Sequence, residues 1–536
     1  MEDDVAPDRP LETTVTPHEA PPPRPFRPLP SLAALCALPA LAGAQLVFEP
    51  PLPSDGGPYA VRTLVADLDG DRFPDALTGH FLFGPGDVTL SRGSNDGAFG
   101  APEPLDFGGA GRQPRRLADF DEDGRLDVLT IGGGVPPLNV AVLLGDGRGG
   151  FGPPLGLNSA HENPIDADVG DFDGDGHLDV VFFNEGFGFS AGSLEVVFGN
   201  GDGSFDAPVA VEASHFDGFA ATHVMRVGDV TGDGLDDIVY TTGSLSNPTW
   251  ISQGDGSFHL AACAGSCNPI IDRDFVLADM DGDGRQDAVT PRNILLATPE
   301  GTFQLSQFVG SAFVPFVVGV GDLDGDGLAD VAVGRNGTAS AQDPELTLGD
   351  VMVYRGLGDG TVQLPGVQVS HVAQPRWVAF ADADLDGRTD LVVAKLQSGT
   401  DTLATLRNHT YAPDSPWLDV GHALAGGNGA PILLADGSLV GGEPCSVRLA
   451  NGLPNGFAKL FIGLSPLFAP FKQGVMVPTP TLFLGPLPLD ATGAIALAGL
   501  FPAGASGATL WMQWWLPHSG GPAGWAASSG VRAQVP

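Results

Sequence analysis

The chain has 536 residues, enough for two or more domains, and its 77 glycines and 48 prolines favour many turns and an all-β fold over long helices. Acidic residues outnumber basic ones 65 to 25, and the net charge of −40 argues against nucleic acid and anionic lipid surfaces as partners. This charge favours cations as partners.

A short apolar run within residues 28–45 follows Arg24 and Arg27 and ends in Ala42-Gly43-Ala44, the pattern of a secretory signal cleaved after Ala44. The run has about 13 apolar residues, interrupted by Pro39, fewer than the roughly 20 that a membrane span needs. We therefore predict a signal peptide with an atypical, acidic, extended N-terminus at residues 1–44, no transmembrane span, and a secreted or cell-surface protein. Of the cysteines that remain after cleavage, Cys263 and Cys267 could form a small disulfide, and Cys445 is left unpaired.

One aspartate-rich pattern of nine residues recurs seven times along the chain. Its first aspartates are 43 to 60 residues apart, about the length of one four-stranded propeller blade with its loops. The copies are DLDGDRFPD (67–75), DFDEDGRLD (119–127), DFDGDGHLD (171–179), DVTGDGLDD (229–237), DMDGDGRQD (279–287), DLDGDGLAD (322–330) and DADLDGRTD (382–390).

The spacing of these aspartates suits a hard cation such as Ca²⁺, which takes six to eight oxygen ligands. A tightly coiled loop points positions 1, 3 and 5 inward, adds the carbonyl of position 7, and closes here with a carboxylate at position 9. Glycine at position 6 permits the φ > 0 turn, but the first copy has Arg72 there, and the fourth has Thr231 at position 3, so these two sites should bind least tightly. The predicted ligands are Asp67, Asp69, Asp71, Phe73, Asp75, Asp119, Asp121, Asp123, Arg125, Asp127, Asp171, Asp173, Asp175, His177, Asp179, Asp229, Thr231, Asp233, Leu235, Asp237, Asp279, Asp281, Asp283, Arg285, Asp287, Asp322, Asp324, Asp326, Leu328, Asp330, Asp382, Asp384, Asp386, Arg388 and Asp390.

Strands should flank each loop. An EF-hand or dockerin-like loop shares the aspartate spacing, but it needs an acid at position 12, which no copy has, and helices on either side. The loops are followed instead by β-branched runs such as DVLTI and DVVFF. Between loops, a strand, a Gly-Asp-Gly type turn and usually a phenylalanine recur, as in GDGRGGF (145–151) and GNGDGSF (199–205). The seventh turn is missing, and residues 45–52 (QLVFEPPL) read as the strand that follows it, so the N-terminus should supply the outermost strand of the last blade.

These loops and turns resemble the FG-GAP and VCBS repeat families, the integrin-alpha-like seven-bladed β-propellers. The resemblance covers residues 45–412 and implies a propeller with up to seven structural Ca²⁺ ions, each in the loop between the first and second strands of a blade. We expect a monomer that acts as an extracellular recognition or adhesion module for a protein or glycan ligand, and not as an enzyme. The alternative is a secreted polysaccharide-active enzyme or a lectin built on the propeller, because some members of these families are lectins or carry such domains.

Longer, variable segments should lie on the face opposite the loops, where ligands would bind. The candidate contact residues there are Phe187, Phe189, Phe216, Phe219, His161 and His215. Residues 413–536 have few charges and several short apolar runs between glycines and prolines, which predict a second, small β-sandwich-like domain. In its run TLWMQWW, Trp514 and Trp515 should point to opposite faces of a strand, one in the core and the other either at a packed edge or exposed as a platform for a sugar or a partner.

Overall fold

The computed structural model describes residues 46–80, 87–108, 111–132, 139–157, 164–184, 193–212, 224–241, 248–261, 274–309, 314–336, 349–396, 401–410, 415–427 and 429–536. The chain divides into two compact units, Met1–Gly43 and Ala44–Pro536, and all described residues belong to the second. The predicted signal peptide, Cys263, Cys267 and the six candidate ligand contacts from His161 to Phe219 lie outside the described residues.

The described chain is all-β, as predicted, and no α-helix occurs in it. Seven antiparallel sheets of four strands each account for its first part. Sheet 1 holds β2 (Ala60–Ala66), β3 (Asp75–His80), β4 (Val88–Ser91) and β5 (Glu103–Leu105); sheet 2 holds β6 (Gln113–Ala118), β7 (Asp127–Ile131), β8 (Val140–Leu143) and β9 (Leu155–Gly156); sheet 3 holds β10 (Pro164–Gly170), β11 (Asp179–Asn184), β12 (Ser193–Val197) and β13 (Val209–Glu212). Sheet 4 holds β14 (Met225–Gly228), β15 (Asp237–Tyr240), β16 (Thr249–Ser252) and β17 (Phe258–Leu260); sheet 5 holds β18 (Val276–Ala278), β19 (Asp287–Val289), β20 (Asn293–Ala297) and β21 (Phe303–Phe308). Sheet 6 holds β22 (Val314–Gly321), β23 (Asp330–Asn336), β24 (Asp350–Tyr354) and β25 (Val367–Ser370); sheet 7 holds β26 (Pro375–Ala381), β27 (Asp390–Lys395), β28 (Leu403–Leu406) and β1 (Leu52–Ser54).

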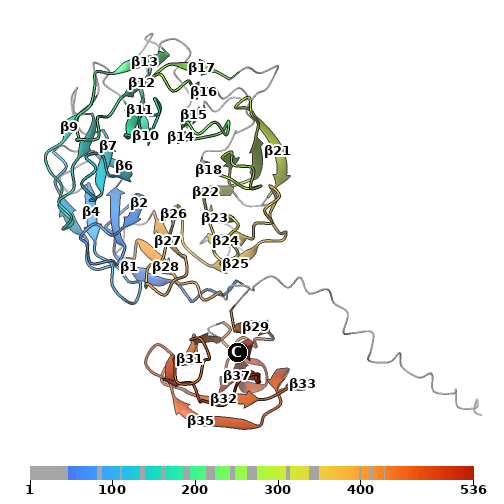
Figure 1. The fold of residues 1–536 in the computed structure, drawn as a ribbon. Coiled ribbons are helices and arrows are strands. Elements are labelled where there is room, and N and C mark those ends of the chain that lie inside the picture. Colours follow the sequence, from blue (N-terminus) through green and yellow to red (C-terminus); the bar gives the residue numbers. More distant parts are fainter. Residues whose placement is uncertain are drawn as a thin grey trace, which may run out of the picture. The chain divides into compact units, whose positions relative to one another are not determined.

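The first strands of the sheets follow one another around a ring (Figure 1). Each of β2, β6, β10, β14, β18 and β22 contacts the first strand of the next sheet, and β26 contacts β2. Neighbouring sheets pack face to face through apolar side chains, as where Ile131 and Val140 of sheet 2 share a buried cluster with Ala167 and Val180 of sheet 3. The second and third strands are fully buried in sheet 2, whereas its fourth strand is exposed, which is the burial expected of blades in a propeller.

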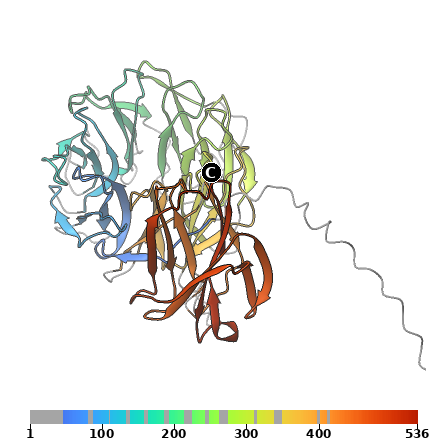
Figure 2. The same ribbon diagram turned by 60° about the horizontal axis from the view of Figure 1, so that its bottom comes forward.

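The N-terminal segment completes sheet 7, as the sequence predicted. Strand β1 pairs antiparallel with β28, so that Leu52 lies opposite Thr405, and an isolated bridge joins Phe48 to Asn408. Both views place this blue segment beside the orange strands of sheet 7 (Figures 1 and 2). The regular strand begins at Leu52, where the predicted strand ended, so the pairing extends further toward the C-terminus than residues 45–52 suggested.

The remaining strands form three further sheets. The largest has the order β29-β39-β37-β32-β35 with β38 paired to β37, and the others are β30-β31-β36 and β33-β34. Their strands are β29 (Trp417–Gly421), β30 (Ile432–Asp436), β31 (Pro444–Ala450), β32 (Phe457–Gly463), β33 (Pro466–Phe471), β34 (Gly474–Pro478), β35 (Leu482–Pro488), β36 (Ile495–Leu500), β37 (Thr509–Pro517), β38 (Trp525–Ala527) and β39 (Gly530–Gln534), and a single 3-10 turn, η3, spans Pro522–Gly524.

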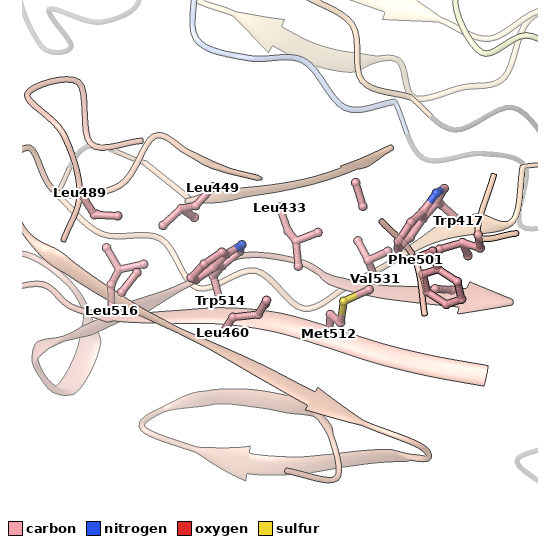
Figure 3. Packing of buried hydrophobic residues seen from close by; sticks show 14 of the residues in the cluster. Trp417, Leu433, Leu449, Leu460, Leu489, Phe501, Met512, Trp514, Leu516 and Val531 are labelled. Atoms are coloured by element: carbon pink, nitrogen blue, oxygen red, sulfur yellow. The ribbon is translucent and has the colours of Figure 1, made fainter. Parts of the chain in front are cut away.

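The apolar core of this part lies between two of these sheets (Figure 3). Leu433 and Leu449 from the smaller sheet pack against Leu460, Met512 and Trp514 from the larger one. The short apolar runs are therefore strands, and several of them contribute to this core.

Trp514 and Trp515 belong to different buried clusters, as expected for neighbours in a strand, but neither is exposed. The Phe471 ring meets Trp515 edge-on with the ring centroids 4.9 Å apart, so Trp515 is not a surface platform for a sugar. Cys445 is a free thiol in the described chain, as expected. Among the described residues, no helix has the length and apolar character to span a membrane.

Candidate metal-binding loops

The seven aspartate loops occupy equivalent places in the seven sheets. In each, position 1 directly follows the first strand of a sheet, and position 9 is the first residue of the second strand. The loop of residues 171–179, for example, connects β10 to β11. The prediction that strands, and not helices, flank the loops is confirmed. All of the predicted ligand residues lie in the described ranges.

Hydrogen bonds within each loop hold two carboxylates in place. In the loop of residues 171–179, Asp171 Oδ2 accepts the N–H of Gly176 at 3.0 Å and Asp175 Oδ1 accepts the N–H of His177 at 2.9 Å. The bond from position 6 to position 1 recurs in all seven loops at 2.8 to 3.0 Å. The bond from position 7 to position 5 recurs over the same range of distances. Seven separate stretches of sequence therefore adopt one loop geometry.

The closing aspartate at position 9 has a second role that the sequence pattern did not reveal. Its Oδ2 accepts the N–H of position 2 at 2.8 to 3.1 Å in every loop. Its Oδ1 accepts an N–H from the end of the third strand of the same sheet at 2.6 to 3.0 Å; the donors are Gly93, Gly145, Gly199, Ser252, Ala297, Gly356 and Asn408. This side chain therefore joins the loop to the turn that leads into the fourth strand.

Burial and neighbouring negative charge perturb these closing carboxylates. At most 1% of each closing residue is exposed. Burial is the main cause that raises the pKa of Asp75 and Asp287 to about 6, and that of Asp179, Asp237, Asp330 and Asp390 to about 7, against the two backbone hydrogen bonds that lower it. Burial also raises the pKa of Asp127. A cation beside these carboxylates would keep them ionised at neutral pH.

The carboxylates converge closely enough to hold a cation. In at least five loops, three aspartates each bring one oxygen within 4.8 Å of the other two; these trios include Asp67, Asp69 and Asp71; Asp119, Asp121 and Asp127; Asp171, Asp173 and Asp179; Asp279, Asp281 and Asp287; and Asp322, Asp324 and Asp330. The Oδ1 atoms of the position-3 aspartates Asp121, Asp324 and Asp384 are buried without a hydrogen-bond partner. A hard cation that prefers oxygen ligands fits this donor set. The assignment of each individual ligand, the position-7 carbonyls included, stays a prediction.

Two features of the loop conformation bear on the weaker copies. Arg72 adopts a φ of 81°, the left-handed region in which the other six loops have glycine, so the expected strain in copy one is present in the backbone. Position 4 is also left-handed, including Glu122 at 55° and Leu385 at 56°, a requirement that was not predicted from the sequence. The signal that could have found it is glycine at position 4 in the other five copies. In copy four, Thr231 Oγ1 lies 3.5 Å from Asp229 Oδ1.

Arginines compensate part of the charge in several loops. Arg125, Arg285 and Arg388, at position 7, each pair with the aspartate at position 5 of their own loop. Arg92 and Arg355, each the last residue before a turn, pair instead with the position-3 aspartates Asp69 and Asp324. In the loop of residues 322–330, Arg355 donates a hydrogen bond to the Oδ2 of Asp324, and the buried Oδ1 of Asp324 has no hydrogen-bond partner.

The loops also connect neighbouring sheets. Gly149, in the turn of sheet 2, donates its N–H to the carbonyl of Leu68 in the loop of sheet 1 at 2.9 Å, and Gly360 of sheet 6 donates to Met280 in the loop of sheet 5 at 3.0 Å. The His177 Nδ1 lies 2.6 Å from the Glu122 Oε1 of the preceding loop. The aspartate loops and the Gly-Asp-Gly turns are therefore at the same end of the sheets.

Comparison with known proteins identifies these repeats. The FG-GAP-like repeat family matches residues 67–130, 119–182, 229–290 and 322–393, and these ranges contain all seven aspartate loops. The chain is an FG-GAP repeat protein. No curated protein matches the chain.

Two solved structures are distantly similar. One is a post-proline cleaving enzyme from Rickettsia typhi, at 10% identity and a TM-score of 0.35, and the match covers 76% of this chain and 59% of that one. The other is TcdB2-TccC3 without its hypervariable C-terminal region, at 12% identity and a TM-score of 0.22, covering 88% of this chain and 29% of that one. The chain thus spans less than two thirds of either structure, and at these TM-scores neither likeness bears on its activity.

Proposed function

We propose that the seven sheets are the blades of one closed seven-bladed propeller that binds up to seven structural Ca²⁺ ions. We further propose that the protein is exported and recognises an extracellular protein or glycan without catalysing a reaction on it. The observation that carries the proposal is the repetition of one carboxylate geometry in seven loops. Two of these loops also accept hydrogen bonds from neighbouring sheets, at Leu68 from Gly149 and at Met280 from Gly360. Such repetition supports a structural role for the ions more than a catalytic one.

The charge of the chain explains why the ions would matter for stability. Positions 1, 3, 5 and 9 of the loops hold 27 of the 65 acidic residues in seven small clusters, and the carboxylates within each cluster repel one another without a cation. Seven Ca²⁺ ions would change the net charge from −40 to −26. Extracellular calcium modules bind at about 10⁻⁴ to 10⁻³ M. Saturation at tenfold over Kd would add roughly 1.4 kcal/mol per site, or about 10 kcal/mol in total.

Calorimetry tests the structural role of calcium. We expect the melting temperature of the whole chain to rise by at least about 10 °C between chelator and millimolar Ca²⁺, and to rise much less with Mg²⁺, which prefers a smaller octahedral site. An unchanged melting temperature would refute the proposal.

A binding screen tests the recognition role. The Ca²⁺-loaded protein is applied to a glycan array and to cell-surface extracts, and the same screen is repeated in chelator. We expect a ligand that binds only the Ca²⁺-loaded form, because the rigid ring presents the loops that would contact it. A polysaccharide depolymerisation assay addresses the alternative of a secreted carbohydrate-active enzyme, and turnover in that assay would replace the recognition proposal.

N-terminal sequencing of the exported protein, with Gln45 expected as its first residue, tests the signal peptide.

A further inference from the structure

Charged side chains gather on the first strands of sheets 1 to 4 and just before that of sheet 5, away from the aspartate loops. These strands surround the centre of the ring (Figure 1). The group contains four arginines and three aspartates: Arg62 on β2, Arg115 and Arg116 on β6, Asp166 and Asp168 on β10, Arg226 on β14, and Asp274 shortly before β18. In a protein with a net charge of −40, this group has an excess of positive charge.

Most of these charges are paired across adjacent sheets. Arg116 holds Asp168 through two hydrogen bonds, from Nε at 2.5 Å and from a terminal nitrogen at 2.6 Å. Arg226 donates to Asp274 at 2.8 Å. Asp166 is shared, because the Arg115 Nε lies 3.5 Å from its Oδ1 and Arg226 lies 3.8 Å from its Oδ2. The three aspartates are therefore all engaged by Arg115, Arg116 and Arg226.

Arg62 is the arginine of this group that has no ion pair among the described residues. Among the described residues, no carboxylate lies within the 4.0 Å of an ion pair to it. Its one hydrogen bond to the part of the chain that the structure describes is long, 3.4 Å from a terminal nitrogen to the carbonyl of Arg115. Its guanidinium carbon lies 4.7 Å from the centroid of the Trp377 ring on β26. Burial and the nearby charge of Arg115 lower the pKa of Arg62 well below its usual range, and the more distant negative charge of Asp166 opposes this shift only in part.

We propose that Arg62 and Trp377 form a binding site for a small carboxylate at the centre of the ring. The Arg62 guanidinium carbon lies over the Trp377 ring, and a cation so placed still has N–H groups to donate to an acceptor. A carboxylate matches that fork through two parallel hydrogen bonds. Arg62 and Trp377 are both only partly buried, and 17% of the Arg115 side chain and 26% of the Arg116 side chain stay exposed, so water reaches this group. This site goes beyond the proposed recognition of macromolecules and does not depend on it.

Titration calorimetry of the Ca²⁺-loaded whole chain tests the site, in buffer without other oxyanions. The probes are acetate, galacturonate and neutral galactose. We expect acetate and galacturonate to bind with one site per chain and galactose not at all. Absence of binding by both carboxylates, or equal binding of galactose, overturns the proposal.

Variants separate this site from the calcium loops, to which a carboxylate can also add. Arg62→Gln should weaken acetate binding at least about tenfold and leave the number of bound Ca²⁺ ions unchanged. Arg148→Gln makes the same replacement at an exposed turn and should bind acetate as the wild type does. If Arg62→Gln does not fold, Arg62→Lys, which keeps the charge but lacks the fork, should fold and bind acetate several-fold more weakly. Unchanged acetate affinity in whichever of these two Arg62 variants folds overturns the assignment.

Discussion

Gly199 donates its backbone N–H to Asp179 Oδ1 at 2.8 Å, and this bond connects an aspartate loop to the turn of the same sheet. The other oxygen of Asp179 accepts the N–H of Phe172 at 2.9 Å. The closing aspartate is thus a structural acceptor even without a cation, whereas Asp175, in the same loop, is exposed. The two positions should differ in what their loss does to the metal-free protein.

Asp179→Ala should destabilise the protein by about 2 to 4 kcal/mol in chelator, because two buried N–H groups lose their acceptor. Asp175→Ala should cost less than about 1 kcal/mol under the same condition, because the N–H of His177 turns to water. Urea denaturation in chelator measures both. Equal losses in the two variants would mean that the closing aspartate acts through the metal alone. Both variants should lose one bound Ca²⁺ in equilibrium dialysis.

Arg72→Gly should stabilise the first loop. Arg72 adopts a φ of 81°, which costs an L-residue about 1 to 2 kcal/mol and is partly offset by the greater chain entropy that glycine has when unfolded. We expect a net gain of about 0.5 to 1 kcal/mol and tighter Ca²⁺ binding at this loop.

The matched control is Gly176→Ala, which reverses that change in the third loop. A Cβ at Gly176 would meet nothing within 4 Å, so its cost comes only from the φ of 90°. Thermal melts should therefore shift in opposite directions for the two variants. A loss of stability in Arg72→Gly would show that the arginine side chain contributes more than its backbone costs.

The metal-free protein should become less stable as the pH rises from about 4 to 7. Burial raises the folded-state pKa of Asp179 and Asp330 to about 7, above the ordinary value of 3.8. A carboxyl whose pKa is raised by folding binds its proton more tightly when folded, so the stability that it contributes is present at low pH and is lost as the pH rises through the folded pKa. The window is about pH 4 to 7.

Calcium should remove most of this dependence above about pH 6, because the bound ion keeps these carboxylates ionised. Melting temperatures measured from pH 5 to 8, in chelator and in saturating Ca²⁺, give the two curves. Parallel curves would contradict a role of these buried carboxyls in metal binding. Ca²⁺ affinity should fall on acidification through the same window, since protons and the ion compete for the same oxygens.

The loops could be predicted from the sequence because their pattern is local. The contacts between residues far apart in the sequence could not be predicted, because they form only when the sheets assemble. The nine-residue aspartate spacing determines a loop by itself, so all seven copies, their flanking strands and the N-terminal completion of sheet 7 could be predicted. The hydrogen bond from Gly199 to Asp179 could not be predicted, because the two residues are 20 positions apart and the sequence around Gly199 does not identify it as the donor. The Arg116–Asp168 pair, 52 residues apart, arises only when β6 and β10 become neighbours in the ring.

Phe48→Ala should weaken the closure of the ring. Phe48 is 8% exposed, lies in the apolar cluster of sheets 6 and 7, and bridges Asn408. Its truncation should cost about 3 to 4 kcal/mol in chemical denaturation. Since the N–H of Asn408 also donates to Asp390 Oδ1 at 2.6 Å, the same change should weaken Ca²⁺ binding in the loop of residues 382–390. Leu155→Ala, on the outermost strand of sheet 2 and 38% exposed, is the control and should cost less than about 1 kcal/mol. Equal losses would mean that the N-terminal segment covers sheet 7 without closing the ring.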